Sequence, residues 1–258
     1  MARREAPRRA AGGIGVKAMT SISEKLVEAA EQLSSAVDKL AFSSPVEYVY
    51  NPLNYAREPH FQYLRRYGDS KKKVIFLGMN PGPWGMAQTG VPFGEINAAK
   101  EYLGIEGEVK KPEPEHPKRP VTGFRCERSE VSGRRLWGMF KDRFGKPEEF
   151  FRDFFVGNYC PLVFMEEGGR NHTPDKLKAG EKEKLFALCD RHLEQVVRIL
   201  EPQWVVGIGR FTENCAIRAL KETSVQIGNI LHPSPASPAA NRDWAGTVTR
   251  QLKELGIL

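Results

Sequence analysis

The sequence predicts an α/β fold in which a four-stranded parallel sheet lies between two layers of helices. Four short segments are apolar almost throughout, as strands buried on both faces are; they are residues 74–78, 154–159, 204–209 and 225–231. Segments with helical periodicity separate them. Strands that alternate with helices indicate right-handed crossovers, so we expect one three-layer α/β/α domain.

The helices are predicted from apolar residues that recur every three or four positions. The first begins at a capping box, because Ser21 and Glu24 have S-x-x-E spacing, and is expected to extend over residues 21–42. An extended stretch at 47–50 and a short helix at 59–67 precede the first buried strand. The remaining predicted helices are 95–103, 130–143, 177–200, 211–222 and 239–255.

The positive charge is concentrated at the N-terminus. Of the formal net charge of +7, the first 19 residues contribute +4, from five basic side chains and one acidic one. We therefore expect residues 1–19 to be a disordered basic tail and residues 20–258 to be a single, mildly basic domain. The charged, proline-rich segment 104–120 is predicted to be a surface loop of that domain.

Several functional classes are disfavoured by what the sequence lacks. No apolar run approaches the roughly 20 residues that cross a bilayer, so no membrane partner is expected. The four cysteines form no C-x-x-C pair, which predicts free thiols, an intracellular location and no structural zinc. The glycines after the first buried strand fit neither phosphate-binding pattern, which disfavours a nucleotide-dependent enzyme.

Polar side chains follow three of the predicted strands. Asn80, Asn158 and His232 stand at these strand ends, and ligands of open parallel sheets bind there. Each residue alone has an ordinary structural explanation, since asparagine favours turns and a single histidine is more often structural. Together they predict one crevice. No Asp, Glu, Lys or Cys stands at these ends to act as a strong base or nucleophile.

The loop 79–95 carries bulky side chains as well as glycine and proline. Trp84, Met86 and Phe93 are expensive to expose, so they belong either to the core or to a pocket for a flat ligand. Beside an asparagine and a histidine, an aromatic surface suits a nucleobase.

Five segments of the chain resemble one known family, the single-strand-selective monofunctional uracil-DNA glycosylases of the uracil-DNA glycosylase superfamily. The resemblance spans about residues 45–255. The segments are GMNPGPWGMAQTGVPFGE at 78–95, EVSGRRLWG at 130–138, GNYCPLVF at 157–164, GRNHTPDKL at 169–177 and HPSPASPAANRDW at 232–244.

The resemblance implies a DNA repair enzyme. It would hydrolyse the N-glycosidic bond of uracil, or of a 5-modified uracil such as 5-hydroxymethyluracil, in single- and double-stranded DNA. The base would be flipped into a pocket and released, leaving an abasic site for base excision repair. The family implies a monomer that needs no metal or cofactor and is located with the DNA, in a prokaryotic cytoplasm or a nucleus.

The resemblance also implies site roles. Asn80 would hold the attacking water, His232 would stabilise charge on uracil O2, and Asn158 would read the O4 and N3–H edge. The other base-binding residues would be Met79, Gly82, Met86 and Phe93. DNA would contact a wedge loop and a second loop, 169–182, through Arg170, Asn171, Thr173, Pro233, Ser234, Pro235, Ala236, Ser237, Pro238, Asn241 and Arg242. Ala236 stands where vertebrate members have an arginine, so duplex penetration is either weaker or assisted by Arg242.

The sequence is also compatible with other functions. The pocket could be tuned to mismatched uracil or to another deaminated base, hypoxanthine or xanthine. The chain could also be a non-catalytic binder of damaged DNA or, less favoured, an α/β nucleotide-binding protein. A lyase is disfavoured because no lysine lies in the strand-end motifs, and an iron–sulfur cluster because clustered cysteines are lacking.

Overall fold

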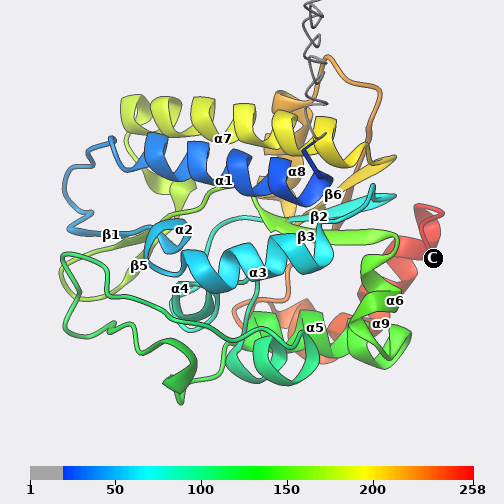
Figure 1. The fold of residues 1–258 in the computed structure, drawn as a ribbon, viewed down its shortest axis with the longest axis horizontal. Coiled ribbons are helices and arrows are strands. Elements are labelled where there is room, and N and C mark those ends of the chain that lie inside the picture. The colour runs from blue at the N-terminus through cyan, green and yellow to red at the C-terminus, as the bar shows by residue number, and fades with distance from the viewer. Residues whose placement is uncertain (1–19) are drawn as a thin grey trace, which may run out of the picture.

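The central sheet has the predicted architecture. The computed structural model describes residues 20–258, so the predicted tail at 1–19 lies outside the described residues. Four parallel strands pair in the order β3, β2, β6, β7 (Figure 1). Their bounds are β2 (Val74–Gly78), β3 (Phe154–Asn158), β6 (Trp204–Ile208) and β7 (Gln226–Ile230). All four carboxyl ends therefore lie at one edge of the sheet.

Burial explains why these segments are strands. Every residue of β2 is buried, because β2 is an inner strand with helices on both faces. β7 lies at the edge of the sheet, and its Gln226 is exposed while Ile230 is buried. The apolar runs in the sequence therefore identified the inner strands most clearly.

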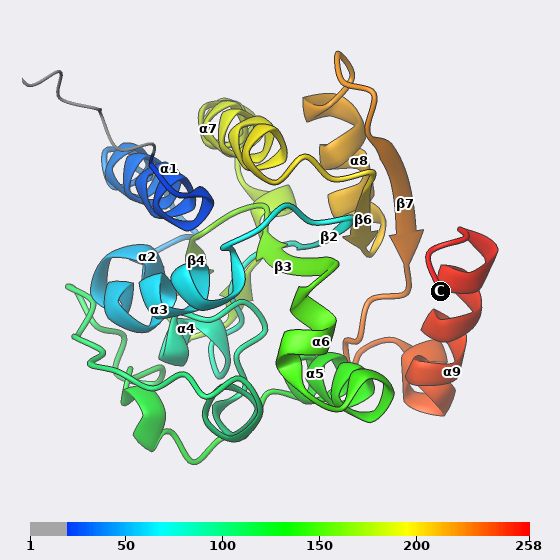
Figure 2. The ribbon, with the colours of Figure 1, turned by 45° about the vertical axis from the view of Figure 1, so that its right-hand side comes forward.

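Helices cover both faces of the sheet (Figure 2). On one side lie α1 (Ile22–Val37), α7 (Ala179–Leu200) and α8 (Arg210–Ala219). On the other lie α5 (Val131–Phe144), α6 (Pro147–Phe151) and α9 (Pro238–Glu254). The remaining helical elements include α2 (Pro52–Tyr55), α3 (Arg57–Tyr67), α4 (Met86–Thr89) and two 3-10 turns, Gly123–Arg125 and Pro174–Lys176.

The first helix begins as predicted but ends early. Ser21 caps α1 by accepting a hydrogen bond from the backbone N–H of Glu24 at 3.2 Å. The helix stops at Val37 because the Asn51 amide binds its C-terminal end, donating to the Asp38 carboxylate at 2.8 Å and to the Ser34 carbonyl at 3.3 Å. A side chain distant in sequence thus sets the end of α1.

Two further expectations need correction. The predicted helix at 95–103 is helical over residues 96–102, but its second part, Ala98–Tyr102, is a π-helical turn, and the Glu95 carboxylate accepts a hydrogen bond from the Ala98 N–H at 3.0 Å. The segment 104–120 has no helix or strand, but it is not wholly superficial. His116 is fully buried, and its backbone N–H donates to the Tyr50 hydroxyl at 2.6 Å.

A second, antiparallel sheet was not predicted. It contains β1 (Tyr48–Tyr50), β4 (Val163–Met165) and β5 (Asn171–His172) in the order β1, β4, β5. β5 lies in the segment 169–182, which the sequence analysis treated as a loop. Such short strands give too few residues for a periodic pattern. Among residues 20–258, no helix is both long and apolar enough to span a bilayer.

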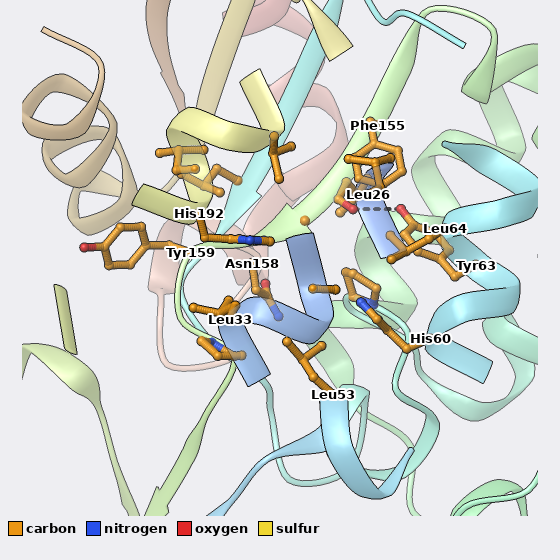
Figure 3. A pocket seen from close by; sticks show the side chains of 18 of the residues that line it. Leu26, Leu33, Leu53, His60, Tyr63, Leu64, Phe155, Asn158, Tyr159 and His192 are labelled. Carbon is orange, nitrogen blue, oxygen red and sulfur yellow. Dashed lines mark hydrogen bonds between the residues drawn. The ribbon is translucent and has the colours of Figure 1, made fainter. Parts of the chain in front are cut away.

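An internal cavity lies between the sheet and the helices α1, α3 and α7 (Figure 3). Its volume is about 70 Å³, and most of its lining is aliphatic or aromatic. His60 and His192 also line it, and Asn158 lies at the end of β3 beside it. His60 is hydrogen-bonded through Nδ1 to the Gly90 carbonyl at 2.7 Å, whereas Nδ1 of His192 has no partner. Burial lowers the pKa of each imidazole to about 4.

These histidines predict acid-sensitive stability. The unfolded chain binds protons at both imidazoles below about pH 6.5, while the folded chain stays unprotonated down to about pH 4. The free energy of unfolding should therefore fall between those values by up to about 3 kcal/mol per histidine and be unaffected by them above pH 6.5. Urea unfolding of wild type and His192→Leu at pH 7 and 4.5 measures this. An equal loss in both proteins would contradict it.

Candidate functional site

The carboxyl edge of the sheet contains an open crevice of about 360 Å³. Residues from the ends of β2, β3 and β7 line it together with the N-terminus of α5 and the segment after β4. The lining residues are Met79, Asn80, Pro81, Gly82, Pro83, Phe93, Glu130, Ser132, Asn158, Asn171, Thr173, His232 and Ser234. The structure thus brings Asn80, Asn158 and His232 together, as their positions after parallel strands predicted.

Asn158 separates this crevice from the internal cavity, since it lines both. Its Nδ2 donates to the Met86 sulfur at 3.1 Å, and its Oδ1 is buried without a partner. Gly78 pairs with Asn158 across the β2–β3 ladder. A methyl group on Gly78 would overlap both Asn158 Oδ1 and the Phe93 ring, so the free amide oxygen lies close to that ring. A buried acceptor without a partner is costly and points to a ligand that donates to it.

Phe93 is held in an unusual backbone conformation. Its φ is +53°, a left-handed value that bulky residues avoid. The N-terminus of α5 packs against this backbone, and any side chain at Gly133 would collide with the Phe93 carbonyl. Backbone strain of this kind costs of the order of 1–3 kcal/mol and is concentrated at functional sites. The ring lines the crevice and also packs against the hydrophobic core.

Asn80 is oriented by one hydrogen bond. Its Nδ2 donates to the Leu162 carbonyl at 2.9 Å, so the amide nitrogen is engaged on the side of β4. The Oδ1 atom is left to accept a hydrogen bond in the crevice. An amide oxygen fixed in this way can hold a water molecule, although it is a poor base.

His232 is a neutral hydrogen-bond donor in this environment. The backbone N–H of Ser234 donates to its Nδ1 at 3.1 Å, so the ring proton belongs to Nε2. Burial lowers the pKa of His232 below its usual value of 6.5. A neutral imidazole with its Nε2–H directed to a ligand can stabilise negative charge on an oxygen atom.

The rest of the segment after His232 forms a short loop at the rim of the crevice. Pro235, Ala236, Pro238, Asn241 and Arg242 are exposed, Pro233 is buried, and Ser237 caps α9 by accepting from the Ala240 N–H. Of the predicted DNA contacts outside this loop, Asn171 and Thr173 line the crevice, and Arg170 is exposed beside it. These positions are compatible with a surface that meets a large ligand.

Arg135 braces this rim loop, which the sequence analysis did not foresee. Its guanidinium donates to the Pro233 carbonyl at 3.1 Å and to Asn241 Oδ1 at 2.8 Å. Asn241 in turn donates to the Pro235 carbonyl at 2.8 Å. The loop is therefore tied to α5 before any ligand arrives, which reduces the entropy lost on binding.

Two bulky residues of the loop 79–95 lie away from the crevice. Met86 is buried behind Asn158 and lines the internal cavity, so it acts on the crevice through the Asn158 amide. Trp84 is partly exposed, with the guanidinium groups of Arg119 and Arg128 over its ring at 5.2 and 4.4 Å. Phe93 is therefore the aromatic side chain of this loop that faces the crevice.

Glu130 is the main site residue that sequence reasoning missed. It precedes α5, and its carboxylate reaches the crevice beside Gly82 and Gly85. Burial and the nearby Glu95 raise the pKa of Glu130 to about 7. No carboxylate follows the predicted strands in the sequence, whereas Glu130 is the residue that precedes the first turn of α5.

We expect loss of the Arg135 brace to loosen the rim loop. In Arg135→Ala, two hydrogen bonds from a charged donor disappear, each worth about 1.5–3 kcal/mol. Amide exchange at residues 236–241 should therefore accelerate tenfold or more while exchange in β2 stays unchanged. Arg134→Ala, which removes a neighbouring exposed arginine, is the matched control. Equal exchange in the two variants would show that the loop is not held by Arg135.

Comparisons with known proteins identify the family of this chain. A family model described as the uracil DNA glycosylase superfamily matches residues 65–253. A single-strand selective monofunctional uracil-DNA glycosylase of Rattus norvegicus is 49% identical over 92% of this chain and 86% of its own length. The Bos taurus protein of that name is 48% identical over 92% of this chain and 88% of its own.

A solved structure supports the fold. The crystal structure of the wild-type Pedobacter heparinus protein described as SMUG2 superposes on this chain with a TM-score of 0.68 and 17% sequence identity. The match covers 92% of this chain and 98% of the SMUG2 chain. The family model and the identity to the mammalian proteins confirm the resemblance seen in the sequence. This chain belongs to the uracil-DNA glycosylase superfamily and, within it, to the single-strand selective monofunctional uracil-DNA glycosylases.

Proposed function

We propose that this protein hydrolyses the bond between uracil and deoxyribose in DNA, releasing the base and leaving an abasic site. The observation that carries the proposal is the buried, partnerless Oδ1 of Asn158 beside the Phe93 ring. Uracil stacked on Phe93 would supply the missing donor through N3–H. Its O4 would accept from the Asn158 Nδ2, which the Met86 sulfur holds only weakly in the free protein.

The chemistry proposed for the crevice depends on charge that develops in the transition state. As the C1′–N1 bond breaks, its electron pair moves onto uracil, and negative charge accumulates at O2. The neutral Nε2–H of His232 donates to that oxygen. Water held by Asn80 Oδ1 adds to the cationic sugar carbon at C1′.

The proposed substrates include uracil with a substituent at C5, such as 5-hydroxymethyluracil, in both single- and double-stranded DNA. Met79 and the side-chain-free Gly82 line the crevice wall assigned to this edge of the base. For duplex DNA, the braced loop of residues 233–242 would fill the space that the flipped base leaves. Ala236 gives this loop a small side chain at its exposed tip.

A labelled oligonucleotide with one uracil tests the proposed function. We expect incubation in EDTA to produce abasic sites that break only after hot alkali, because base release needs no metal and cleaves no phosphodiester bond. Strand breakage before alkali would show a lyase and contradict the proposal. If no strand breaks after alkali, the assay is repeated with hypoxanthine, xanthine and 5-hydroxymethyluracil. Breakage with one of these identifies a different substrate base, and no breakage with any of them shows that the protein releases none of the four bases.

Removing either charge-handling group should slow the chemical step. We expect Asn80→Ala and His232→Leu each to lower the single-turnover rate about 10²–10³-fold, because a preorganised group of this kind is worth about 2.7–4 kcal/mol. DNA affinity, measured by anisotropy, should stay within a few fold. Wild-type rates in both variants would refute the role assignment.

Asn158 should determine the choice between uracil and cytosine. Cytosine has a donor at N4 and an acceptor at N3, so the Asn158 amide rejects it. In Asn158→Asp, a carboxylate accepts from N4, and discrimination against cytosine should fall at least tenfold, as expected when a base contact worth about 1–3 kcal/mol is lost. The exposed Asn97→Asp is the control. Unchanged discrimination in Asn158→Asp would exclude Asn158 as the base reader.

A further inference from the structure

The crevice contains a carboxyl group that the proposed chemistry has not used. Glu130 lines it together with Asn80 and His232. Its two carboxylate oxygens lie against the turn that follows Asn80, where a methyl group on Gly82 or Gly85 would overlap them. The absence of side chains at the two glycines thus leaves room for this carboxylate, and Glu130 and Gly82 line the same crevice as Asn80.

No contact within the fold explains this placement. Among residues 20–258, the Glu130 carboxylate has no hydrogen bond to its own helix, although residues at this position commonly cap one. It also has no salt bridge in that part of the chain. A partly buried carboxyl without a partner contributes nothing to the stability of the fold, so its presence in a crevice indicates a functional role.

The electrostatic surroundings make Glu130 a weak acid. Two titratable side chains line the crevice, Glu130 and His232, and the buried Glu95 lies behind the start of α5. Burial and the charge of Glu95 raise the pKa of Glu130 to about 7. Burial lowers the pKa of His232, which is therefore neutral around pH 7. Of these two crevice side chains, Glu130 is therefore the one whose protonation changes near neutral pH.

We propose that Glu130 is a catalytic base that accepts a proton from the water held by Asn80. The proposal rests on the proposed function. As the C1′–N1 bond breaks, its electron pair leaves with uracil, which His232 stabilises at O2. The water oxygen bonds to C1′, and one of its protons passes to a Glu130 oxygen. Uracil later takes a proton at N1 from solvent, and Glu130 returns its proton to solvent.

This division of labour fits the residue types. Asn80 can orient water but cannot take its proton, whereas a carboxylate with a pKa near the working pH is an efficient base. A role in DNA binding is disfavoured, because an ionised carboxylate repels the phosphates of the substrate. Because only the ionised carboxylate accepts a proton, the chemical step should quicken as pH rises through about 7.

Single-turnover uracil release with enzyme in excess, from pH 5.5 to 8.5, tests the proposal. Glu130→Gln keeps the shape of the side chain and removes the base. We expect it to be 10²–10³-fold slower than wild type at pH 8, with a flattened pH profile and DNA affinity equal or tighter. Glu127→Gln, an exposed glutamate three positions earlier, should match wild type.

The outcomes separate this proposal from the proposed function. If wild type releases uracil and Glu130→Gln is within threefold of it at every pH, the catalytic role alone is overturned. If Glu130→Gln is slower by one factor at all pH values and also binds DNA more weakly or melts earlier, its role is structural. A flat wild-type profile across pH 7 also overturns the proposal, without any variant. If wild type releases no uracil, both proposals fail.

Discussion

The site depends on the parallel register of the central sheet. Gly78 of β2 is paired with Asn158 of β3, and β7 ends at the same edge of the sheet, immediately before His232. Three residues separated by up to about 150 positions therefore meet without any long loop to order them. A slip of one residue would turn the Asn158 side chain to the opposite face of the sheet, so the site depends on the observed register of β2 with β3.

Several groups that line the crevice at the edge of this sheet do not stabilise the folded protein. Asn158 has a buried acceptor without a partner, Phe93 has a strained backbone, and the Glu130 carboxyl has no salt bridge within the described residues. Stability comes from elsewhere, notably the aromatic cluster of β2, α5 and α6, where Phe140 and Phe150 have ring centroids 4.2 Å apart. The groups that lower the free energy of unfolding thus lie in the crevice, whereas the contacts that raise it lie in the core.

Much of the fold followed from the sequence because burial leaves a direct pattern. Apolar runs identified the four central strands, and helical periodicity identified the long helices within a few residues, apart from the end of α1. The second sheet was missed because its strands contain two or three residues each. The end of α1 depends on Asn51, a tertiary contact that no local pattern encodes.

The site likewise contains residues that the sequence pattern identifies and residues that only tertiary packing brings into place. Asn80, Asn158 and His232 could be found because strand topology alone brings them to one edge. Glu130 and Arg135 could not, because they reach the crevice and its rim only through the packing of α5, which Gly133 allows to approach Phe93. The family resemblance implies that Met86 belongs to the base pocket, and in the structure Met86 lies behind Asn158, whose amide donates to its sulfur.

The central claim is that Asn158, Phe93 and His232 form a single receptor for uracil. The most direct measurement is a crystal structure of the protein with free uracil and DNA containing an abasic site. The account predicts uracil stacked on Phe93, with N3–H on Asn158 Oδ1, O4 on its Nδ2 and O2 on His232 Nε2. Uracil bound elsewhere, or bound in the crevice with Asn158 still donating to the Met86 sulfur, would contradict the account.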